Sequence, residues 1–432
     1  MRRVTIGALG PMLVALAFTA YGCGGGGAEA GKGEKLTIGQ FVDFSGPLGE
    51  QALTEVAGCL ASQNAIKAAG GVLGHQLSCQ RYDAGADPAD AVPAAARMLS
   101  NAQNLVLTQG PDEVAAAVAP IISARKVVMM SVAGDAHFDK NTDPYFYRTV
   151  PSDDVAAEAM AFWAHKTGHK NVAMLFENGG GATTVIEPVK AALGRLKINI
   201  VQNLTIAPDQ TSYRTEVQSL LHSHPEVILT ETDSQTAATF FSELLELNGG
   251  KMLPLQGTAA TVQGAYEEPL VHAIGAQNVE KYFEATNIAE PTPGPALTEY
   301  QHYLKTVGPE VPRPEQYALE PYSTCVYDSN IVAALAMVAA KATSPEKYQP
   351  YISKVSGAPG AGRVEVSTYA EGLKDLQAGK QIVYIGTSGP MLWDQYHNRE
   401  GDFQALKYDP ASRENKAIAT ITSQELKQVR GS

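Results

Sequence analysis

The chain is poor in cysteine, in charged residues and in basic residues. Its 432 residues include 4 cysteines and 2 tryptophans, and 18% of them are charged. There is no CxxC pair and no Cys/His cluster, so we predict no metal site, and no cofactor is implied. Only 33 Lys and Arg stand against 45 Asp and Glu, a net charge of −12. This balance argues against nucleic-acid binding, which needs a basic surface.

Long apolar runs are absent beyond the N-terminus. The run at residues 331–340 is too short to span a bilayer. Hydrophobic residues make up 44% of the sequence, as in soluble globular proteins. The chain that follows the N-terminal segment is long enough for two domains with cores of their own.

The N-terminus is typical of an export signal. A basic pair precedes a short apolar run at residues 6–19, and small residues lead to Cys23. This pattern resembles a bacterial lipobox with Cys23 as the lipidated residue; an ordinary signal peptide cut elsewhere is the alternative. We assign residues 1–22 to the signal peptide and residues 23–34 to a lipid anchor with a Gly-rich tether. The protein is then expected to be exported and lipid-anchored at the cell envelope, on its periplasmic or extracellular face.

Strand-like and helix-like runs alternate between residues 36 and 257. The strand candidates are short and rich in Val, Ile and Leu, which is typical of parallel strands covered on both faces. Asp87 before Pro88, and Ser152 after Pro151, are helix N-cap signals. The alternation predicts a doubly wound α/β fold. The expected strands are 36–44, 76–82, 105–108, 127–131, 172–176, 198–204, 227–230 and 253–256.

Two such sheets are expected, joined by three crossings that form a hinge. The crossings are predicted near residues 146–151, 282–286 and 382–394. A ligand would then lie in the cleft at the carboxyl ends of the strands. Lobe 1 is expected to comprise residues 35–150 and 287–385, and lobe 2 residues 151–286 and 390–425. The late part of lobe 1 is mainly helical, with helices expected at 297–307, 322–342, 345–355 and 368–378.

The remaining cysteines separate into a candidate pair and a single thiol. Cys59 lies on the first long helix and Cys79 on the second strand, which are adjacent elements of one βαβ unit. A disulfide between them fits an oxidising compartment, and two free thiols are the alternative. Cys325 lies in a helical run and is most simply a buried free thiol.

Several blocks together resemble the type I periplasmic binding proteins of the branched-chain amino-acid/amide ABC transporter class, the relatives of leucine-binding protein. The resemblance covers residues 35–410 and implies two Rossmann-like lobes with a three-segment hinge. It also implies a monomeric receptor that closes on a small solute and delivers it to an ABC permease and its ATPase. The blocks are Ile38-Gly39 with Ser45-Gly46-Pro47, Gly70–Gly74, Tyr82-Asp83, Asp87-Pro88, Tyr147-Arg148-Thr149, Gly389-Pro390 and Gly401-Asp402.

In this family the first lobe contacts the ligand through the loops after its third and fourth strands. Here these loops supply Asp112 and Glu113, then Ser131, Ala133 and Asp135. Acids stand where amino-acid binders tend to carry Ser or Thr, and an acid at the carboxylate seat repels a carboxylate. The structural alternatives are a helix cap for Asp112 and a solvent-facing position for Glu113.

The resemblance assigns second-lobe contacts to Glu177, Gly180, Asp233 and Thr258, and a cleft-lining role to Tyr322. The alternatives are a plain turn for Gly180, a helix cap for Asp233 and packing for Tyr322. The loop at Thr258 lacks the acid that usually holds an ammonium group. The sequence therefore favours a neutral polar, amide-like or cationic ligand, with an α-amino acid in an altered pose as the alternative.

Catalytic patterns are sparse, and we predict no enzyme. The segment Gly386–Pro390 is not a GxSxG elbow because Pro stands at its last position. His222 and His224 are two residues apart and do not share a helix face. The alternative function is a sensory or regulatory receptor of the same fold that signals to a membrane partner.

Overall fold

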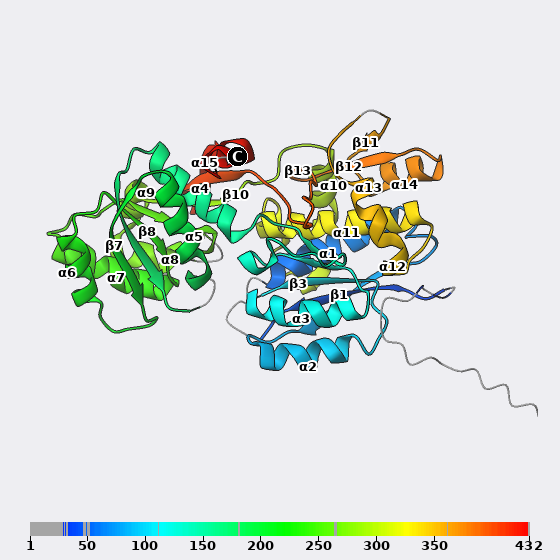
Figure 1. The fold of residues 1–432 in the computed structure, drawn as a ribbon, viewed down its shortest axis with the longest axis horizontal. Coiled ribbons are helices and arrows are strands. Elements are labelled where there is room, and N and C mark those ends of the chain that lie inside the picture. Colours follow the sequence, from blue (N-terminus) through cyan, green and yellow to red (C-terminus); the bar gives the residue numbers. More distant parts are fainter. Residues whose placement is uncertain are drawn as a thin grey trace, which may run out of the picture.

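The computed structural model describes residues 29, 31, 33–45, 49, 52–110, 112–179, 182–262, 266–360 and 362–430. The predictions for the signal peptide, for Cys23 and for Gly180 lie outside these residues. Two lobes stand side by side (Figure 1). One contains the blue, cyan, yellow and orange parts of the chain, and the other contains the green part and the red C-terminal part. Each lobe is built on its own sheet, as the sequence predicts.

The sheet of lobe 1 is parallel and has the strand order β2-β1-β3-β4-β5. Its apolar side chains are buried on both faces, against α1 and α11 on one side and α2 and α3 on the other. The strands are β1 (Leu36–Val42), β2 (Leu77–Asp83), β3 (Leu105–Gln109), β4 (Met129–Ser131) and β5 (Phe146–Arg148). The helices are α1 (Ala52–Ala68), α2 (Pro88–Met98), α3 (Asp112–Ala124), α10 (Pro295–Leu304) and α11 (Pro321–Ala340).

A small helical and β region completes lobe 1 at its outer end. Helix α11 is long and apolar enough to cross a membrane by length and composition, but it is buried in the core of lobe 1. It is therefore the central helix of a globular lobe. The other elements here are α12 (Pro345–Tyr348), α13 (Ile352–Val355), α14 (Tyr369–Gln377), β11 (Val364–Val366), β12 (Ile382–Gly386) and β13 (Gly389–Pro390). Short 3-10 turns occur in both lobes. They lie at Ala136–Phe138, Ala259–Val262, Gly308–Glu310, Pro314–Tyr317 and Gln349–Tyr351.

Lobe 2 has a mixed sheet of order β15-β14-β10-β9-β8-β6-β7. Its last two strands run antiparallel, β14 against β10 and β15 against β14, and the sequence did not predict this hairpin. The strands are β6 (Asn171–Glu177), β7 (Asn199–Ile206), β8 (Val227–Glu231), β9 (Leu255–Gly257), β10 (Phe283–Ile288), β14 (Phe403–Asp409) and β15 (Glu414–Ile421). The helices are α4 (Asp153–Lys166), α5 (Ala182–Arg195), α6 (Arg214–His222), α7 (Ser234–Leu247), α8 (Glu267–Ile274), α9 (Ala276–Tyr282) and α15 (Ser423–Arg430).

Local signals in the sequence set the helix starts. The Asp87 side chain accepts hydrogen bonds from the backbone N–H groups of Ala89 and Asp90, and Pro88 occupies the first helical position. The Ser152 hydroxyl accepts the N–H of Val155 at the start of α4. Both predicted caps are confirmed.

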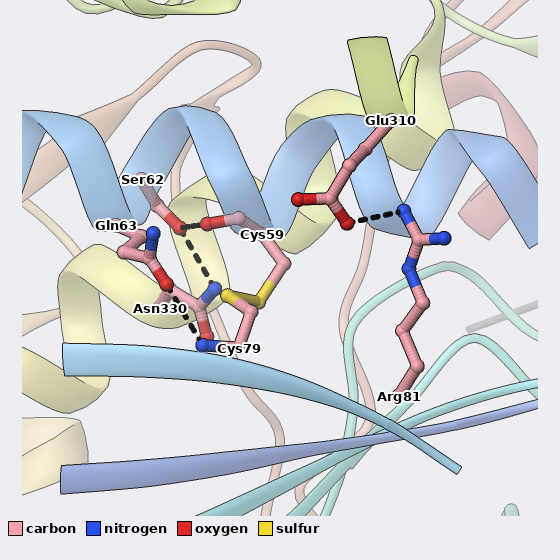
Figure 2. The surroundings of a disulfide bond; sticks show 7 residues. All are labelled: Cys59, Ser62, Gln63, Cys79, Arg81, Glu310 and Asn330. Atoms are coloured by element: carbon pink, nitrogen blue, oxygen red, sulfur yellow. Dashed lines mark hydrogen bonds and ion pairs between the residues drawn. A yellow bond between two sulfur atoms is a disulfide. The ribbon is translucent and has the colours of Figure 1, made fainter. Parts of the chain in front are cut away.

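A disulfide joins Cys59 of α1 to Cys79 of β2, with 6.3 Å between their Cα atoms. Figure 2 shows its surroundings, in which the Gln63 side chain accepts the backbone N–H of Cys79 at 2.9 Å. The amide of Asn330 on α11 donates to the Ser62 hydroxyl at 2.8 Å. The bridge therefore lies where α1, β2 and α11 meet. Cys325 is a buried free thiol, as predicted.

The chain passes between the two sheets three times: after β5, after β10 and after β13. Arg399, on the last of these connections, joins it to the first connection and to α11. Its guanidinium donates to the Thr149 carbonyl and to the Cys325 sulfur, both at 3.2 Å, and to the Ser388 hydroxyl at 2.5 Å. The second passage was predicted near residues 282–286, but Tyr282 ends α9 and residues 283–286 belong to β10 in lobe 2.

Candidate functional site

The candidate residues lie at the carboxyl ends of parallel strands. In lobe 1, β3 ends at Gln109 and β4 at Ser131; in lobe 2, β6 ends at Glu177, β8 at Glu231 and β9 at Gly257. Loops that follow neighbouring parallel strands meet at one edge of a sheet. The geometry therefore concentrates the predicted site residues at one edge of each sheet.

Asp112 opens α3 and points toward the neighbouring loop. Its carboxylate accepts the backbone N–H of Gly134 at 3.0 Å. Burial, and then the nearby charges of Asp153 and Asp135, raise the pKa of Asp112 to about 7, against the opposing effect of the backbone amides of Gly134 and Asp135. The carboxylate of the protein itself thus occupies amides of the loop after β4.

Asp153, the first residue of α4, lies against the same loop. Its backbone N–H donates to the Gly134 carbonyl at 2.8 Å, and its carboxylate accepts the Thr184 hydroxyl at 3.0 Å. A Cβ atom on Gly134 would lie 1.9 Å from an oxygen of Asp153, so only glycine permits this approach. Burial raises the pKa of Asp153 to about 6, against the opposing effects of Thr184 and Arg148.

Glu231, the last residue of β8, completes a cluster of acids. Its carboxylate accepts the Thr258 hydroxyl at 2.6 Å. Burial raises its pKa to about 7, with a smaller contribution from Asp153. Burial, and then the charges of Glu320 and Asp153, raise the pKa of Tyr322. We call Asp112, Asp153 and Glu231 the acid cluster; Tyr322 borders it.

Glu177 and Asp233 form a second acidic pair beside this cluster. The backbone N–H of Asp233 donates to the Glu177 carboxylate at 2.8 Å. Asp233 also caps α7 by accepting the N–H groups of Gln235 and Thr236, so the cap interpretation is confirmed. Burial and the adjacent Asp233 raise the pKa of Glu177 to about 7. Burial opposes a lower pKa for Asp233, but hydrogen bonds to Glu177 and Thr236 outweigh it.

The other predicted residues have simpler environments. Glu113 is exposed on the first turn of α3, and Asp135 caps a 3-10 turn through the N–H of His137. The Ser131 hydroxyl is buried and accepts the N–H of Ala133 at 3.1 Å. Both residues line a hollow of about 10 Å³, room for about one water. Thr108 lines it too, and its buried hydroxyl has no hydrogen-bond partner within the described residues.

Sequence reasoning did not select three residues of this site. Thr108 stands on a strand whose following loop was singled out, and Asp153 was read only as part of a helix start. Glu231 was noted as an acid in the loop of Asp233, but Asp233 was chosen as the contact. Glu231 matters most, because it supplies an acid beside Thr258, where the loop itself has none. The pairing of β8 with β9 brings them together, and the order of strands in a sheet is what the sequence does not state.

Metal binding finds no support at this site. Among the described residues, no group of three or more His, Cys, Asp or Glu side chains is arranged to hold a metal ion. Arg148 supplies a positive charge that opposes the raised pKa of Asp153; it is buried and donates to the carbonyls of Gly134 and Asp135 at 2.9 and 3.0 Å. Arg148 thus holds the loop after β4 in place through two of its backbone carbonyls.

Comparison with known proteins places this fold in a family. The family model described as "Periplasmic binding protein" matches residues 35–354. A Leu/Ile/Val-binding protein of Rhizobium johnstonii is 25% identical over 189 residues, which are 43% of this chain and 52% of that protein. The match thus spans about half the length of this curated relative.

Solved structures extend the likeness to nearly the whole chain. A leucine-binding protein from Thermotoga maritima superposes with a TM-score of 0.69 at 17% identity, covering 90% of this chain and 99% of that one. A solute-binding protein of an ABC transporter from R. palustris, solved with 4-hydroxybenzoate, gives 0.68 at 18% identity, covering 90% and 97%. The chain therefore belongs to the periplasmic binding protein family, in the type I class that includes the leucine-binding proteins.

Proposed function

We propose that this protein is the extracytoplasmic substrate-binding component of an ABC importer and that it captures a small cationic or amide-like solute by hinge closure. The observation that carries the proposal is the acid cluster, in which Asp112 of lobe 1 and Asp153 and Glu231 of lobe 2 influence one another's charge. A ligand drives closure only by binding the closed state better than the open one. A cation held by acids from both lobes meets that condition.

The backbone amide that would donate to a ligand anion already donates to a carboxylate of the protein. In this fold a helix N-terminus and its loop amides suit a ligand carboxylate. Here Asp112 accepts the Gly134 N–H, so a ligand carboxylate would have to displace it and face its charge. The R. palustris relative was solved with 4-hydroxybenzoate, an anion. We infer that this chain has a different ligand preference from such relatives.

The raised pKa values of these acids support a positively charged ligand. Buried acids near one another repel while ionised, and a bound cation relieves both the repulsion and the loss of solvation. The proposed ligand contacts are Asp112, Asp153, Glu231, Thr258 and Tyr322, with Ser131, Ala133 and Asp135 shaping the lobe-1 side. Glu177, Gly180 and Asp233 remain proposed contacts of lobe 2, and Glu113 an outer one.

We further propose that the chain carries a lipid on Cys23, acts as a monomer beside a permease and ATPase, and has no catalytic activity. The boundaries proposed for the lobes remain residues 35–150 with 287–385, and 151–286 with 390–425. The family supports an extracytoplasmic location, since its description names the periplasm. Mass spectrometry of the protein from membranes tests the lipid directly.

A thermal-shift screen tests the ligand class. Residues 24–432 retain every described helix and strand and can be screened against polyamines, amino amides, leucine, isoleucine, valine and 4-hydroxybenzoate. A specific ligand at a hundredfold excess over its Kd stabilises by about 2.7 kcal/mol. We expect a cationic or amide compound to raise the melting temperature. Stabilisation by leucine or 4-hydroxybenzoate alone contradicts the proposed ligand class but leaves the receptor role standing.

A further inference from the structure

Lobe 1 carries a large hollow far from the acid cluster. It has a volume of about 1150 Å³ and lies where the C-terminal ends of α1, α11, α13 and α14 meet. Figure 1 places α13 and α14 at the end of lobe 1 that faces away from lobe 2. Apolar side chains form part of its lining: Leu73, Val338, Val355, Leu373, Leu376 and Ile382.

The charged side chains of this lining are all basic. They are Lys341, Lys354, Arg363 and Lys380. No Asp or Glu is among the described residues that line the hollow, although the whole chain has a net charge of −12. Lys380 pairs with Asp375 at 2.8 Å. Cations are favoured at helix C-termini, which accounts for lysines near these helix ends. It does not account for the apolar surface that lies beside them.

Leu73 stands out at the edge of the hollow. It is 42% exposed and has a φ of 51°, a left-handed conformation in which a branched apolar residue is strained. Val72 and His75 exchange two backbone hydrogen bonds of 2.9 Å around Leu73 and Gly74. A two-residue turn with both φ angles positive favours Asn-Gly. Neither the backbone nor burial therefore explains leucine at this position.

The beginning of the described chain lies on the same end of the lobe. The Glu29 carboxylate accepts the backbone N–H of Thr343 at 2.6 Å, two residues beyond Lys341. The Glu34 carbonyl lies 2.9 Å from the ring of His75, next to the turn that presents Leu73. The six residues from Cys23 to Glu29 reach at most about 21 Å when fully extended. A membrane that holds Cys23 is therefore within reach of this end of lobe 1.

We propose that this end of lobe 1 docks on an anionic phospholipid surface. The docking face consists of the Leu73 turn and the basic rim of the hollow, Lys341, Lys354, Arg363 and Lys380. The basic groups contact lipid headgroups while Leu73 enters the interfacial layer, and the apolar wall of the hollow faces the same layer. The inference rests on the proposed anchor at Cys23, which makes a weak contact sufficient because tethering raises the local concentration.

A fluorescence experiment tests the docking face. Residues 24–432 carry an N-terminal histidine tag, which nickel-chelating lipids hold on vesicles in place of the native lipid. Leu73→Cys is labelled with an environment-sensitive dye, and Cys59, Cys79 and Cys325 do not compete because they are bridged or buried. Ile418→Cys, at a position 45% exposed on β15 of lobe 2, is the matched control. We expect the dye at position 73 to brighten on phosphatidylglycerol vesicles but not on phosphatidylcholine, and the dye at 418 to respond to neither.

Charge variants decide the cause of the response. K341Q/K354Q/K380Q should lower the equilibrium constant for docking on the vesicle roughly a hundredfold, because each lysine near an anionic surface contributes roughly fivefold. The control K197Q/K251Q/K281Q removes equal charge from lobe 2 and should change nothing. An equal response at positions 73 and 418, or on both lipids, overturns the proposal. Binding of a soluble fatty acid in the hollow without any vesicle response also overturns it, in favour of a ligand site. The tag holds the protein on the vesicle in place of the lipid on Cys23, so the experiment does not depend on that lipid. A thermal-shift screen of the same preparation against solutes tests the proposed function independently of docking.

Discussion

At the scale of single residues, Asp112 shows what a sequence can and cannot reveal about this site. Its position after the third strand was enough to mark it as a departure from amino-acid binders. The choice between a cap and a ligand contact needed the structure, because the carboxylate accepts an amide from a different loop, Gly134. Asp153 and Glu231 were not selected as contacts because their proximity arises from strand order and from the close approach that Gly134 permits.

Replacing Asp112 by Asn tests its role. The amide oxygen can still accept the Gly134 N–H, but the charge that repels Asp153 is lost. We expect the ligand-free protein to gain about 1 kcal/mol of stability at pH 8, and the affinity for a cationic ligand to fall at least about tenfold. Thermal melts and titration calorimetry measure the two effects. Glu268→Gln, at an exposed position on the first turn of α8 and outside the proposed contacts, is the control and should change neither. Tighter binding of a cationic ligand by D112N would contradict the proposed ligand class.

The acid cluster also predicts how stability depends on pH. The pKa values of Asp112, Asp153 and Glu231 are raised in the folded protein to about 7, 6 and 7. A raised folded-state pKa contributes stability that is fully present below the unfolded pKa, near pH 4, and is lost as pH rises through the folded pKa. The ligand-free protein should therefore become less stable between pH 5 and pH 8.

Melting curves across this range check the sign, and the double variant D112N/E231Q should reduce the slope of the profile. Part of the slope should persist, because the pKa values of Glu177 and Glu320 are also raised to about 7. Carboxyl groups with a lowered pKa, such as Glu29 and Asp409 at about 2, change stability only in more acidic solution. They therefore do not affect the profile between pH 5 and pH 8. Stability that rises from pH 5 to pH 8 would contradict the prediction, because it would mean that folding does not raise the pKa values of these acids.

At the scale of elements, short apolar runs predicted the parallel strands well, and capping residues predicted the starts of α2 and α4. The hairpin of β14 and β15 was missed because polar residues interrupt the apolar ones in both strands, and β15 is largely exposed at the edge of the sheet. A strand of this kind owes its conformation to pairing with β14 and leaves little periodicity in the sequence. β10 is a different case: it was taken for a crossing segment, yet it is a buried inner strand between β9 and β14.

The disulfide is the element-scale feature whose effect is easiest to measure. It closes a loop of sequence separation 20 between α1 and β2. Replacing Cys59 and Cys79 together by Ala should lower the free energy of unfolding by about 3 kcal/mol, mainly by freeing the unfolded chain. Ligand affinity should not change, because the bridge lies away from the strand ends. Chemical denaturation with and without reductant measures the effect. The double variant should be insensitive to reductant, and an unchanged midpoint in the native chain on reduction would contradict the prediction.

At the scale of the whole molecule, the three connections between the sheets make the two lobes a hinged pair. Arg399 ties the first and last connections to α11 through Thr149, Ser388 and Cys325. The sequence indicated the number of crossings from the alternation of its elements. It could not indicate the hydrogen bonds of Arg399, because Thr149 and Cys325 are distant from Arg399 in the sequence. These two partners are also a backbone carbonyl and a thiol, which carry no signal for such a bond.

Closure is the property that separates a hinged receptor from a rigid binder. Because the proposed ligand is held by acids of both lobes, its binding should favour a compact state, whereas a solute bound to one lobe leaves the hinge unchanged. Small-angle scattering of residues 24–432 should show a smaller radius of gyration on addition of a stabilising cationic or amide solute. E231Q removes a lobe-2 charge while keeping an acceptor for Thr258, so the same solute should close this variant only at higher concentration. A stabilising solute that leaves the radius unchanged would place its site within one lobe and count against capture by closure.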